Sequence, residues 1–161
     1  MTLEFLGGNK LQLLMNGDAY FPALQQAFDA AHSEIYLETY IFNDDATGRG
    51  IAAALVRAAG RGVRVMLLLQ GRVEYMLLHY ATRALYGSLL DAGVEIYEYH
   101  KSFLHAKVAV IDQRWATVGS SNIDPFSLML AREANIVADD AKFSQELRRS
   151  CLLYTSDAAD E

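Results

Sequence analysis

Residues 103–122, FLHAKVAVIDQRWATVGSSN, hold a histidine, a lysine and an aspartate at fixed spacing, followed by a glycine–serine segment. His105 and Lys107 lie in a run of apolar and β-branched residues, which is typical of a β-strand. Side chains two positions apart on a strand point to the same face, so imidazole and ammonium should share one side. The apolar residues at the alternate positions then fall on the other side and can be buried. The pattern predicts a polar pair that faces a cleft.

The rest of the chain alternates between predicted strands and helices. Strands are expected at Lys10–Met15, Glu34–Phe42, Val63–Leu69, Val94–Tyr99, Phe103–Ile111, Trp115–Val118 and Glu133–Ala138. Helices are expected at Ala19–His32, Thr47–Ala59, Arg72–Ala92 and Ala141–Arg149, with Asp18 as the cap of the first. Apolar strands that alternate with helices predict an α/β sandwich with a mixed β-sheet flanked by helices.

Composition limits the classes of protein to which the chain can belong. Its 161 residues are 52% hydrophobic, which predicts one domain with a core of its own. The net charge of -6 argues weakly against binding nucleic acid by bulk electrostatics, although a local basic cleft stays possible. No run approaches the ~18 apolar residues of a membrane-spanning helix, and the N-terminus lacks a signal-peptide pattern. We therefore expect a soluble chain.

A histidine that faces a cleft can be a metal ligand, a base or a nucleophile. Metal binding is the weaker alternative, because the other histidines show no ligand spacing and Lys107 would repel a cation beside His105. A lysine at this place suits an anionic group, of which phosphate is the commonest. Ser120 and Asn122 add neutral donors for the phosphate oxygens. These residues indicate phosphoryl chemistry that uses no metal and no other cofactor.

Two segments carry a family resemblance. HAKVAVID at 105–112 and GSSN at 119–122 closely resemble the H-x-K-x4-D-x6-G-S-x-N signature of the phospholipase D superfamily. The resemblance implies a phospholipase D-like α/β sandwich, with one HKD repeat in a domain that covers residues 1–150. It further implies a catalytic group made of His105, Lys107 and Asp112.

The same resemblance assigns a role to each residue. His105 would be either the nucleophile that forms a phosphohistidine or the general acid that protonates the leaving alcohol. Lys107 and Asn122 would bind the phosphate, and Asp112 would support the site. Glu133 fits the carboxylate that orients the histidine and fixes its tautomer, although a surface acid on a strand is the alternative.

Within the superfamily, GNKLQLLMNGDAYFPAL, IYLETYIF and GSSNIDPFSL resemble bacterial cardiolipin synthases, which transfer a phosphatidyl unit onto a phospholipid head-group alcohol. The resemblance implies an anionic phospholipid substrate such as phosphatidylglycerol, and a place in the bacterial cytoplasm at the surface of the inner membrane. A phosphohistidine intercepted by an alcohol gives transfer, whereas one intercepted by water gives hydrolysis. A homodimeric HKD phosphodiesterase or nuclease, with nucleic acid as its partner, therefore stays an alternative.

The chain departs from these synthases in one respect, because they carry two HKD repeats and this chain has one motif. Residues 1–64 resemble the opening of a first repeat, and Gln70–Arg149 resembles a second. We hypothesise a junction at the segment Arg61–Val65, which both repeats would share. The alternatives are a natural single-motif protein that pairs two copies into one site, and an inactive half-enzyme fragment.

The C-terminal segment CLLYTSDAADE, residues 151–161, can be encoded by a transposase adapter used in DNA library preparation. We expect it to be a non-native tail, with an ordinary acidic tail as the alternative. The single cysteine of the chain, Cys151, belongs to this segment. Without the tail the chain would have neither a disulfide nor a thiolate nucleophile.

Overall fold

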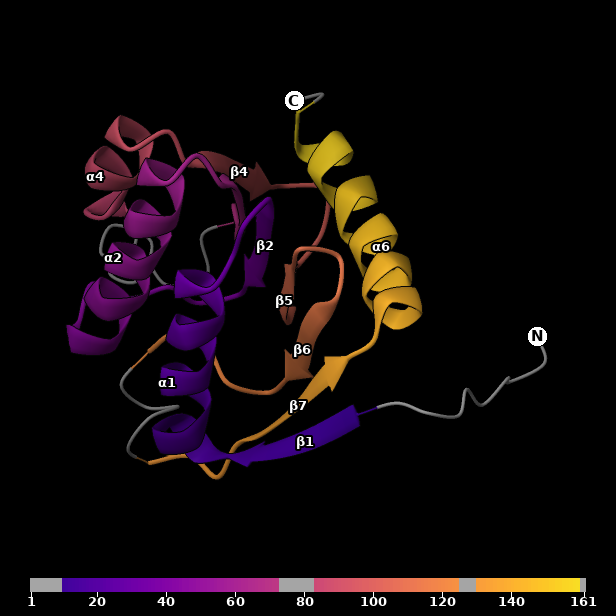
Figure 1. The fold of residues 1–161 in the computed structure, drawn as a ribbon. Helices are drawn as coiled ribbons and strands as arrows, with labels where there is room; N and C mark the ends of the chain where they lie inside the picture. Colours follow the sequence, from indigo (N-terminus) through magenta and orange to yellow (C-terminus); the bar gives the residue numbers. More distant parts are fainter. Residues whose placement is uncertain (1–9, 73–82, 125–129, 160–161) are drawn as a thin grey trace.

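The computed structural model describes residues 10–72, 83–124 and 130–159. They form a mixed β-sheet that lies between two layers of helices (Figure 1). The strands are β1 (Lys10–Met15), β2 (Glu34–Thr39), β3 (Arg64–Gln70), β4 (Glu95–Tyr99), β5 (Lys107–Ile111), β6 (Trp115–Gly119) and β7 (Ala134–Asp139). The helices are α1 (Asn16–Asp29), α2 (Ala46–Gly60), α4 (Tyr86–Asp91) and α6 (Ala141–Ala159). The predicted α/β sandwich with a mixed sheet is confirmed.

The sheet has the order β1-β7-β6-β5-β2-β3-β4 and changes character at its centre. β2, β3 and β4 are parallel, whereas β5, β6, β7 and β1 continue the sheet with antiparallel pairs. Because β5 is antiparallel to β2, the first residue of β5 lies beside the last residue of β2. β6 ends and β7 begins at this same end of the sheet. We call it the Lys107 end of the sheet.

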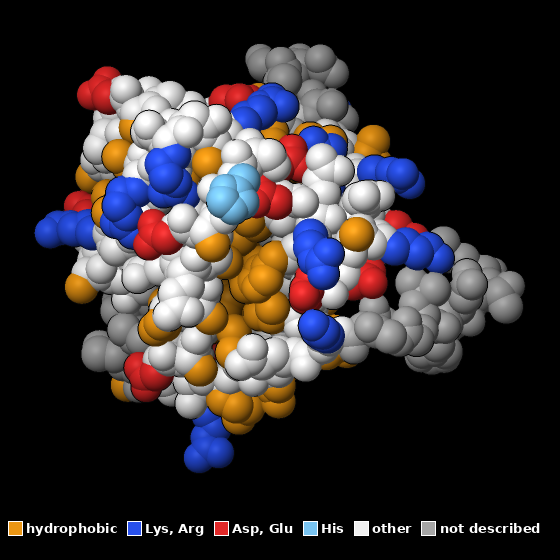
Figure 2. All heavy atoms as spheres, in the orientation of Figure 1, with side chains coloured by type: hydrophobic (Ala, Val, Ile, Leu, Met, Phe, Trp, Pro, Cys, Tyr) orange, Lys and Arg blue, Asp and Glu red, His pale blue; other side chains and the backbone are white. Residues whose placement is uncertain are grey.

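Both faces of the central strands are buried. The larger core lies between the sheet and the layer of α1 and α2, and it includes Leu37, Leu67 and Ala109. A second core, with Tyr36 and Val110, lies under α6 on the opposite face (Figure 1). Figure 2 shows hydrophobic side chains between the two helical layers and again along the lower edge of the view, where β1 lies. None of the described helices combines the length and apolar character needed to cross a bilayer.

The first helix begins earlier than predicted. α1 begins at Asn16 rather than Ala19, and its N-cap residue is Met15, which makes no side-chain cap hydrogen bond. Asn16 has a φ of 58°. Its backbone N–H donates to Glu133 O (2.9 Å), and its Oδ1 accepts from Glu133 N (3.2 Å). These bonds turn the chain directly after β1, so Asp18 lies within the first turn and the predicted cap is wrong.

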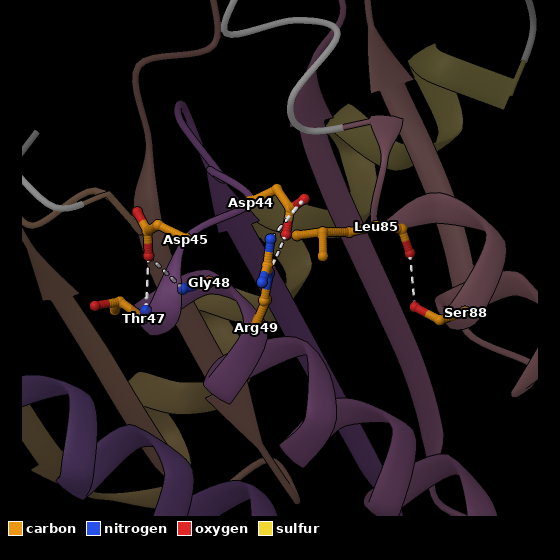
Figure 3. Close-up of polar contacts among 7 residues, drawn as sticks. All are labelled: Asp44, Asp45, Thr47, Gly48, Arg49, Leu85 and Ser88. Carbon is orange, nitrogen blue, oxygen red and sulfur yellow. Dashed lines mark hydrogen bonds and ion pairs between the residues drawn. The ribbon is translucent and has the colours of Figure 1, made fainter.

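The second helix shows the side-chain cap that the first one lacks. Asp45 Oδ1 accepts from the backbone N–H groups of Thr47 (2.6 Å) and Gly48 (2.9 Å) at the start of α2 (Figure 3). Such a cap satisfies donors that have no partner inside the helix. Asp44 pairs with Arg49 on the outer surface of the same turn (Figure 3). α2 thus extends the predicted helix by one residue at each end.

Two further predicted helices differ from the structure: part of one lies outside the described residues, and the other ends later than predicted. Of the helix expected at residues 72–92, residues 73–82 lie outside the described part, and α4 begins at Tyr86. α6 does not end at Arg149 but continues to Ala159. The residues after 149 favour this, since buried Cys151 and Thr155 are one turn apart and both contact the Tyr36 hydroxyl. The domain boundary at residue 150 stays a prediction.

Asp112 connects two loops by hydrogen bonds at the end of the sheet opposite the Lys107 end. Its carboxylate accepts the backbone N–H groups of His32 (2.9 Å), Ser33 (2.8 Å) and Glu34 (3.0 Å), and the Ser33 hydroxyl (2.8 Å). Asp112 itself has a φ of 50° in the turn between β5 and β6. The carboxylate therefore fixes the start of β2 to the end of β5.

These hydrogen bonds set the protonation of Asp112. Burial by itself would raise its pKa, but the backbone donors of Glu34, Ser33 and His32 outweigh burial and lower the pKa below 3.8. A lowered pKa means that the folded protein is stabilised by the ionised form at neutral pH. That stabilisation is lost as the pH falls through the lowered pKa.

We expect Asp112→Asn to lower the free energy of unfolding by about 1–3 kcal/mol at pH 7, because charge-assisted hydrogen bonds are lost. The difference from the wild type should shrink as the pH falls through the lowered pKa of Asp112. Urea denaturation at pH 7 and at a series of lower pH values measures this. Asp139→Asn is the matched control, since Asp139 forms an exposed ion pair with Arg114 (2.6 Å) and should cost less than about 1 kcal/mol. Equal losses in the two variants at pH 7 would contradict the role of Asp112.

Candidate active site

A row of polar positions crosses the sheet at the Lys107 end. Thr39 of β2 lies opposite Lys107 of β5, and Gly119 of β6 lies opposite Asn135 of β7. The pairing of β5 with β6 makes Lys107 and Gly119 the next opposed positions, so all four share one face. Thr39 is 1% exposed, Lys107 6% and Asn135 0%. We call these four positions the polar row.

The histidine and the lysine of the motif meet, although not in the predicted way. The strand expected from Phe103 begins only at Lys107, so His105 precedes β5 instead of lying on it. The strand argument for a shared face is therefore wrong for this pair. Their side chains nevertheless converge, with Lys107 Nζ 3.0 Å from His105 Nε2. The imidazole is exposed, whereas the ammonium is buried.

His105 is held by hydrogen bonds on both sides of it in the chain. Leu104 N donates to Gln70 Oε1 at the end of β3 (2.8 Å). Tyr40 N, directly after β2, donates to Ala106 O (3.0 Å). These two bonds fix the segment before β5 against the ends of β2 and β3. The position of the imidazole thus depends on strands far away in sequence.

Lys107 lies at the border of the main core, and the predicted cleft in front of it stays a prediction. Its face of β5 continues with Ala109 and Ile111, which are core residues. Burial is the largest influence on its pKa and lowers it below 10.5, while the charges of Glu133 and Asp124 act in the opposite direction. The ring of Tyr40 lies 5.2 Å from Nζ. An ammonium in these surroundings is a ready partner for an anionic group.

The ammonium also determines how the imidazole can act. Lysine offers donors and no acceptor, so the 3.0 Å contact makes Nε2 of His105 the acceptor and assigns the ring proton to Nδ1. The Tyr40 ring, 5.0 Å from the imidazole between centroids, lies beside the pair. An anionic phosphoryl group bound by Lys107 would meet the lone pair of Nε2. This geometry suits attack on phosphorus.

The structure distributes the other predicted site residues unevenly. Asn122 is half-buried and follows the end of β6. Ser120 is exposed, and its hydroxyl accepts from Ala134 N (3.1 Å) and donates to Ala134 O (3.4 Å). Glu133 acts electrostatically on Lys107. Their roles toward phosphate and histidine stay predictions.

Asp112 is the predicted catalytic residue that the structure places elsewhere. It lies at the far end of β5 from Lys107, and a strand of this length separates the two residues by about 15 Å. Its carboxylate is directed to the backbone of residues 32–34. Asp112 therefore stabilises the fold and makes no contact with His105 that would place it in a reaction.

Sequence reasoning missed several residues of the site. Tyr40 and Thr39 reach it through the pairing of β2 with β5, which no local pattern reveals. Asp124 is 4% exposed and lies two positions after Asn122, so its closeness to the motif was a usable signal. Asn135 interrupts an otherwise apolar strand, which was a second usable signal. In the described ranges, no three His, Cys, Asp or Glu side chains are grouped so that they could hold a metal ion.

Comparisons with known proteins show the family of the chain. Residues 24–151 match the family described as cardiolipin synthase, PLD-like domain. Cardiolipin synthase B of Escherichia coli is 42% identical over 125 residues, which are 78% of this chain and 29% of the relative. Cardiolipin synthase A of Erwinia tasmaniensis is 33% identical over 155 residues, which are 92% of this chain and 31% of the relative. The chain thus spans less than a third of the length of these relatives.

Solved structures show the same fold. Nuc, a phospholipase D family member from Salmonella typhimurium, has a TM-score of 0.79 at 18% identity, with 93% of this chain and 96% of that chain covered. Phosphatidylserine synthase from Haemophilus influenzae has a TM-score of 0.71 at 13% identity, with 93% and 40% covered. From the family match and the 42% identity, the chain belongs to the phospholipase D superfamily, in the family of cardiolipin synthase PLD-like domains.

Proposed function

We propose that this site takes part in phosphatidyl transfer of the cardiolipin synthase type, with His105 as the nucleophile and an anionic phospholipid such as phosphatidylglycerol as the substrate. The observation that carries the proposal is the 3.0 Å contact between His105 Nε2 and the buried ammonium of Lys107. A phosphodiester has an oxyanion for the ammonium and an electrophilic phosphorus for the imidazole. The family match supplies the lipid as the substrate class.

The reaction proceeds in two displacements at phosphorus. In the first, Nε2 of His105 attacks and the bond from phosphorus to the glycerol head-group oxygen breaks, so that glycerol leaves with a proton from a general acid. In the second, the head-group hydroxyl of another phosphatidylglycerol gives its proton to a base and attacks the phosphohistidine. The bond from phosphorus to Nε2 breaks, and cardiolipin is released.

The neighbouring residues serve the charge that develops on phosphorus. Lys107 and Asn122 bind the non-bridging phosphate oxygens. Ser120 also donates a hydrogen bond to one of them once its hydroxyl turns away from Ala134. Glu133 holds the Nδ1–H side of His105, so that Nε2 carries the lone pair that attacks. The negative charges of Glu133 and Asp124 also oppose, in part, the lowering of the Lys107 pKa by burial.

A second acid must protonate the leaving alcohol, and we propose that it comes from a second HKD motif. Either a second copy of this chain or another repeat in a longer protein would supply it. The substrate would be reached at the cytoplasmic surface of the bacterial inner membrane. If two copies form the site, the rate per chain should rise with protein concentration.

A homodimeric phosphodiesterase or nuclease is the second candidate. The observation in its favour is the fold, which Nuc, a phospholipase D family member, shares with a TM-score of 0.79. The same His105 and Lys107 would then transfer the phosphoryl group to water. Cleavage of DNA without formation of cardiolipin would favour this candidate, and an inert monomer would favour a half-enzyme.

We expect the wild-type chain to convert phosphatidylglycerol in vesicles into cardiolipin and glycerol, and His105→Ala to reduce the rate by about 10³-fold or more, because the nucleophile is lost. Mass spectrometry of the lipids measures the product. Rapid denaturation at alkaline pH, at which a phosphohistidine persists, should trap phosphorus label from the lipid on the wild type and not on His105→Ala. His32→Ala is the control, since His32 is exposed at the opposite end of the sheet. An active His105→Ala variant would contradict the proposal.

We expect Lys107→Met to raise KM for the phospholipid and to lower kcat, because the oxyanion loses its cation. Burial lowers the pKa of Lys107, so the alkaline fall of kcat/KM in the wild type should begin below pH 10.5. Residual activity of Lys107→Arg, whose cation does not titrate, should lack that fall. Lys142→Met, an exposed lysine of α6, should keep the wild-type profile. An unchanged profile in Lys107→Arg would exclude Lys107 as the titrating group.

A further inference from the structure

Asn135 is a polar residue where the strand pattern calls for an apolar one. It is 0% exposed in β7, and its partner across the β1–β7 pair is Leu14, a residue of the main core. Val137, two positions further on the same face, belongs to that core as well. A buried carboxamide costs free energy unless it is hydrogen-bonded, whereas a leucine here would gain it. The asparagine therefore needs a specific partner.

That partner is Ser121. Asn135 Nδ2 donates to Ser121 Oγ (2.8 Å), and Asn135 Oδ1 accepts from Ser121 N (3.4 Å). Ser121 is itself only 2% exposed. The carboxamide thus uses both of its ends on one residue. Ser121 lies directly before Asn122, the proposed phosphate ligand.

Gly119 provides the space for this arrangement. It lies opposite Asn135 in the sheet, and a Cβ added at this position would come within 2.8 Å of the Asn135 Cα and would collide with the carboxamide. The absence of a side chain lets the carboxamide lie over the end of β6 and reach Ser121. Ser120 is fixed separately, by its bonds to Ala134 of the same strand. The first three residues of the GSSN segment are therefore all used to attach the loop to β7.

We infer that Asn135 is a positioning residue, which sets the place of Asn122 relative to Lys107 by binding Ser121 across Gly119. The inference rests on the proposed function, in which Asn122 and Lys107 hold one phosphoryl group. Only the strand β6 separates Lys107 from Asn135, about 10 Å between their backbones, so Asn135 attaches the loop two strands away from Lys107 at the same end of the sheet. Asn135 itself makes no contact with the substrate.

The test is binding of inorganic phosphate to the full chain, measured by calorimetric titration. Asn135→Leu keeps the branched shape of the side chain and removes both hydrogen bonds, and Ser121→Ala removes Ser121 Oγ, the acceptor of one of them. We expect each variant to bind phosphate about 10-fold more weakly, and the double variant to bind no more weakly than either, because both changes break one connection. In turnover, KM should rise more than kcat falls.

Ser88→Ala is the matched control for the serine. Its hydroxyl donates to the backbone oxygen of Leu85 (3.0 Å), in the α4 region (Figure 3). It should lose some thermal stability and keep the wild-type affinity for phosphate. If Asn135→Leu does not fold, Ser121→Ala alone carries the test. Wild-type affinity in folded Asn135→Leu or Ser121→Ala, or additive losses in the double variant, would overturn the inference.

Amide hydrogen exchange separates this inference from the proposed function. Exchange at Ser121 and Asn122 should be faster in Asn135→Leu than in the wild type and unchanged in Ser88→Ala. A wild-type chain that binds no phosphate would count against the proposed function, whereas faster exchange would still support the role of Asn135. Unchanged exchange at Ser121 in Asn135→Leu would overturn that role.

Discussion

The buried ammonium of Lys107 is the constraint that the surrounding structure has to accommodate. A lysine that is 6% exposed at the border of an apolar core costs several kcal/mol unless other groups compensate. Here the compensation comes from the charges of Glu133 and Asp124, the face of the Tyr40 ring and the lone pair of His105. These groups belong to four separate segments of the chain. Stabilising one cation therefore also brings together the residues that phosphoryl transfer would use.

The mixed sheet explains why the four segments meet at the Lys107 end of the sheet. β2 and β3 are parallel and end there, while β5 runs against β2 and begins there. In open α/β sheets, sites tend to form beyond the ends of strands where the order or direction of the chain changes. The boundary between β2 and β5 is such a place, because the parallel half of the sheet meets the antiparallel half along it. At the opposite end of the sheet, Asp112 stabilises the fold through its hydrogen bonds to residues 32–34.

The parts that local sequence could predict are those with local causes. Apolar runs separated by turn residues predicted the strands and the mixed sheet, and the spacing of His105 and Lys107 predicted their proximity. What failed depends on distant partners. His105 leaves the strand because Gln70 and Tyr40 hold its neighbours, and α6 continues past Arg149 because Tyr36 of β2 offers it a contact.

The polar row shows the same limit from another side. The motif names Gly119 and Asn122 but treats residue 121 as variable, and nothing near it in the sequence relates it to Asn135. The relation follows from the register of β6 with β7, which brings together residues that are 14 positions apart. The sequence shows Asn135 as a polar residue in a predicted strand. Its role could be inferred only once the strand register placed it beside Gly119 and Ser121.

The contact between Lys107 and His105 bears on the two roles that the motif leaves open for the histidine. An ammonium 3.0 Å from Nε2 favours the form in which Nε2 carries a lone pair, because a proton on Nε2 would set two hydrogen-bond donors against each other. The nucleophile needs that lone pair, and the acid needs that proton. Before substrate is bound, the geometry therefore favours His105 as the nucleophile. Under the proposed mechanism, the leaving alcohol would then take its proton from a second, differently placed acid.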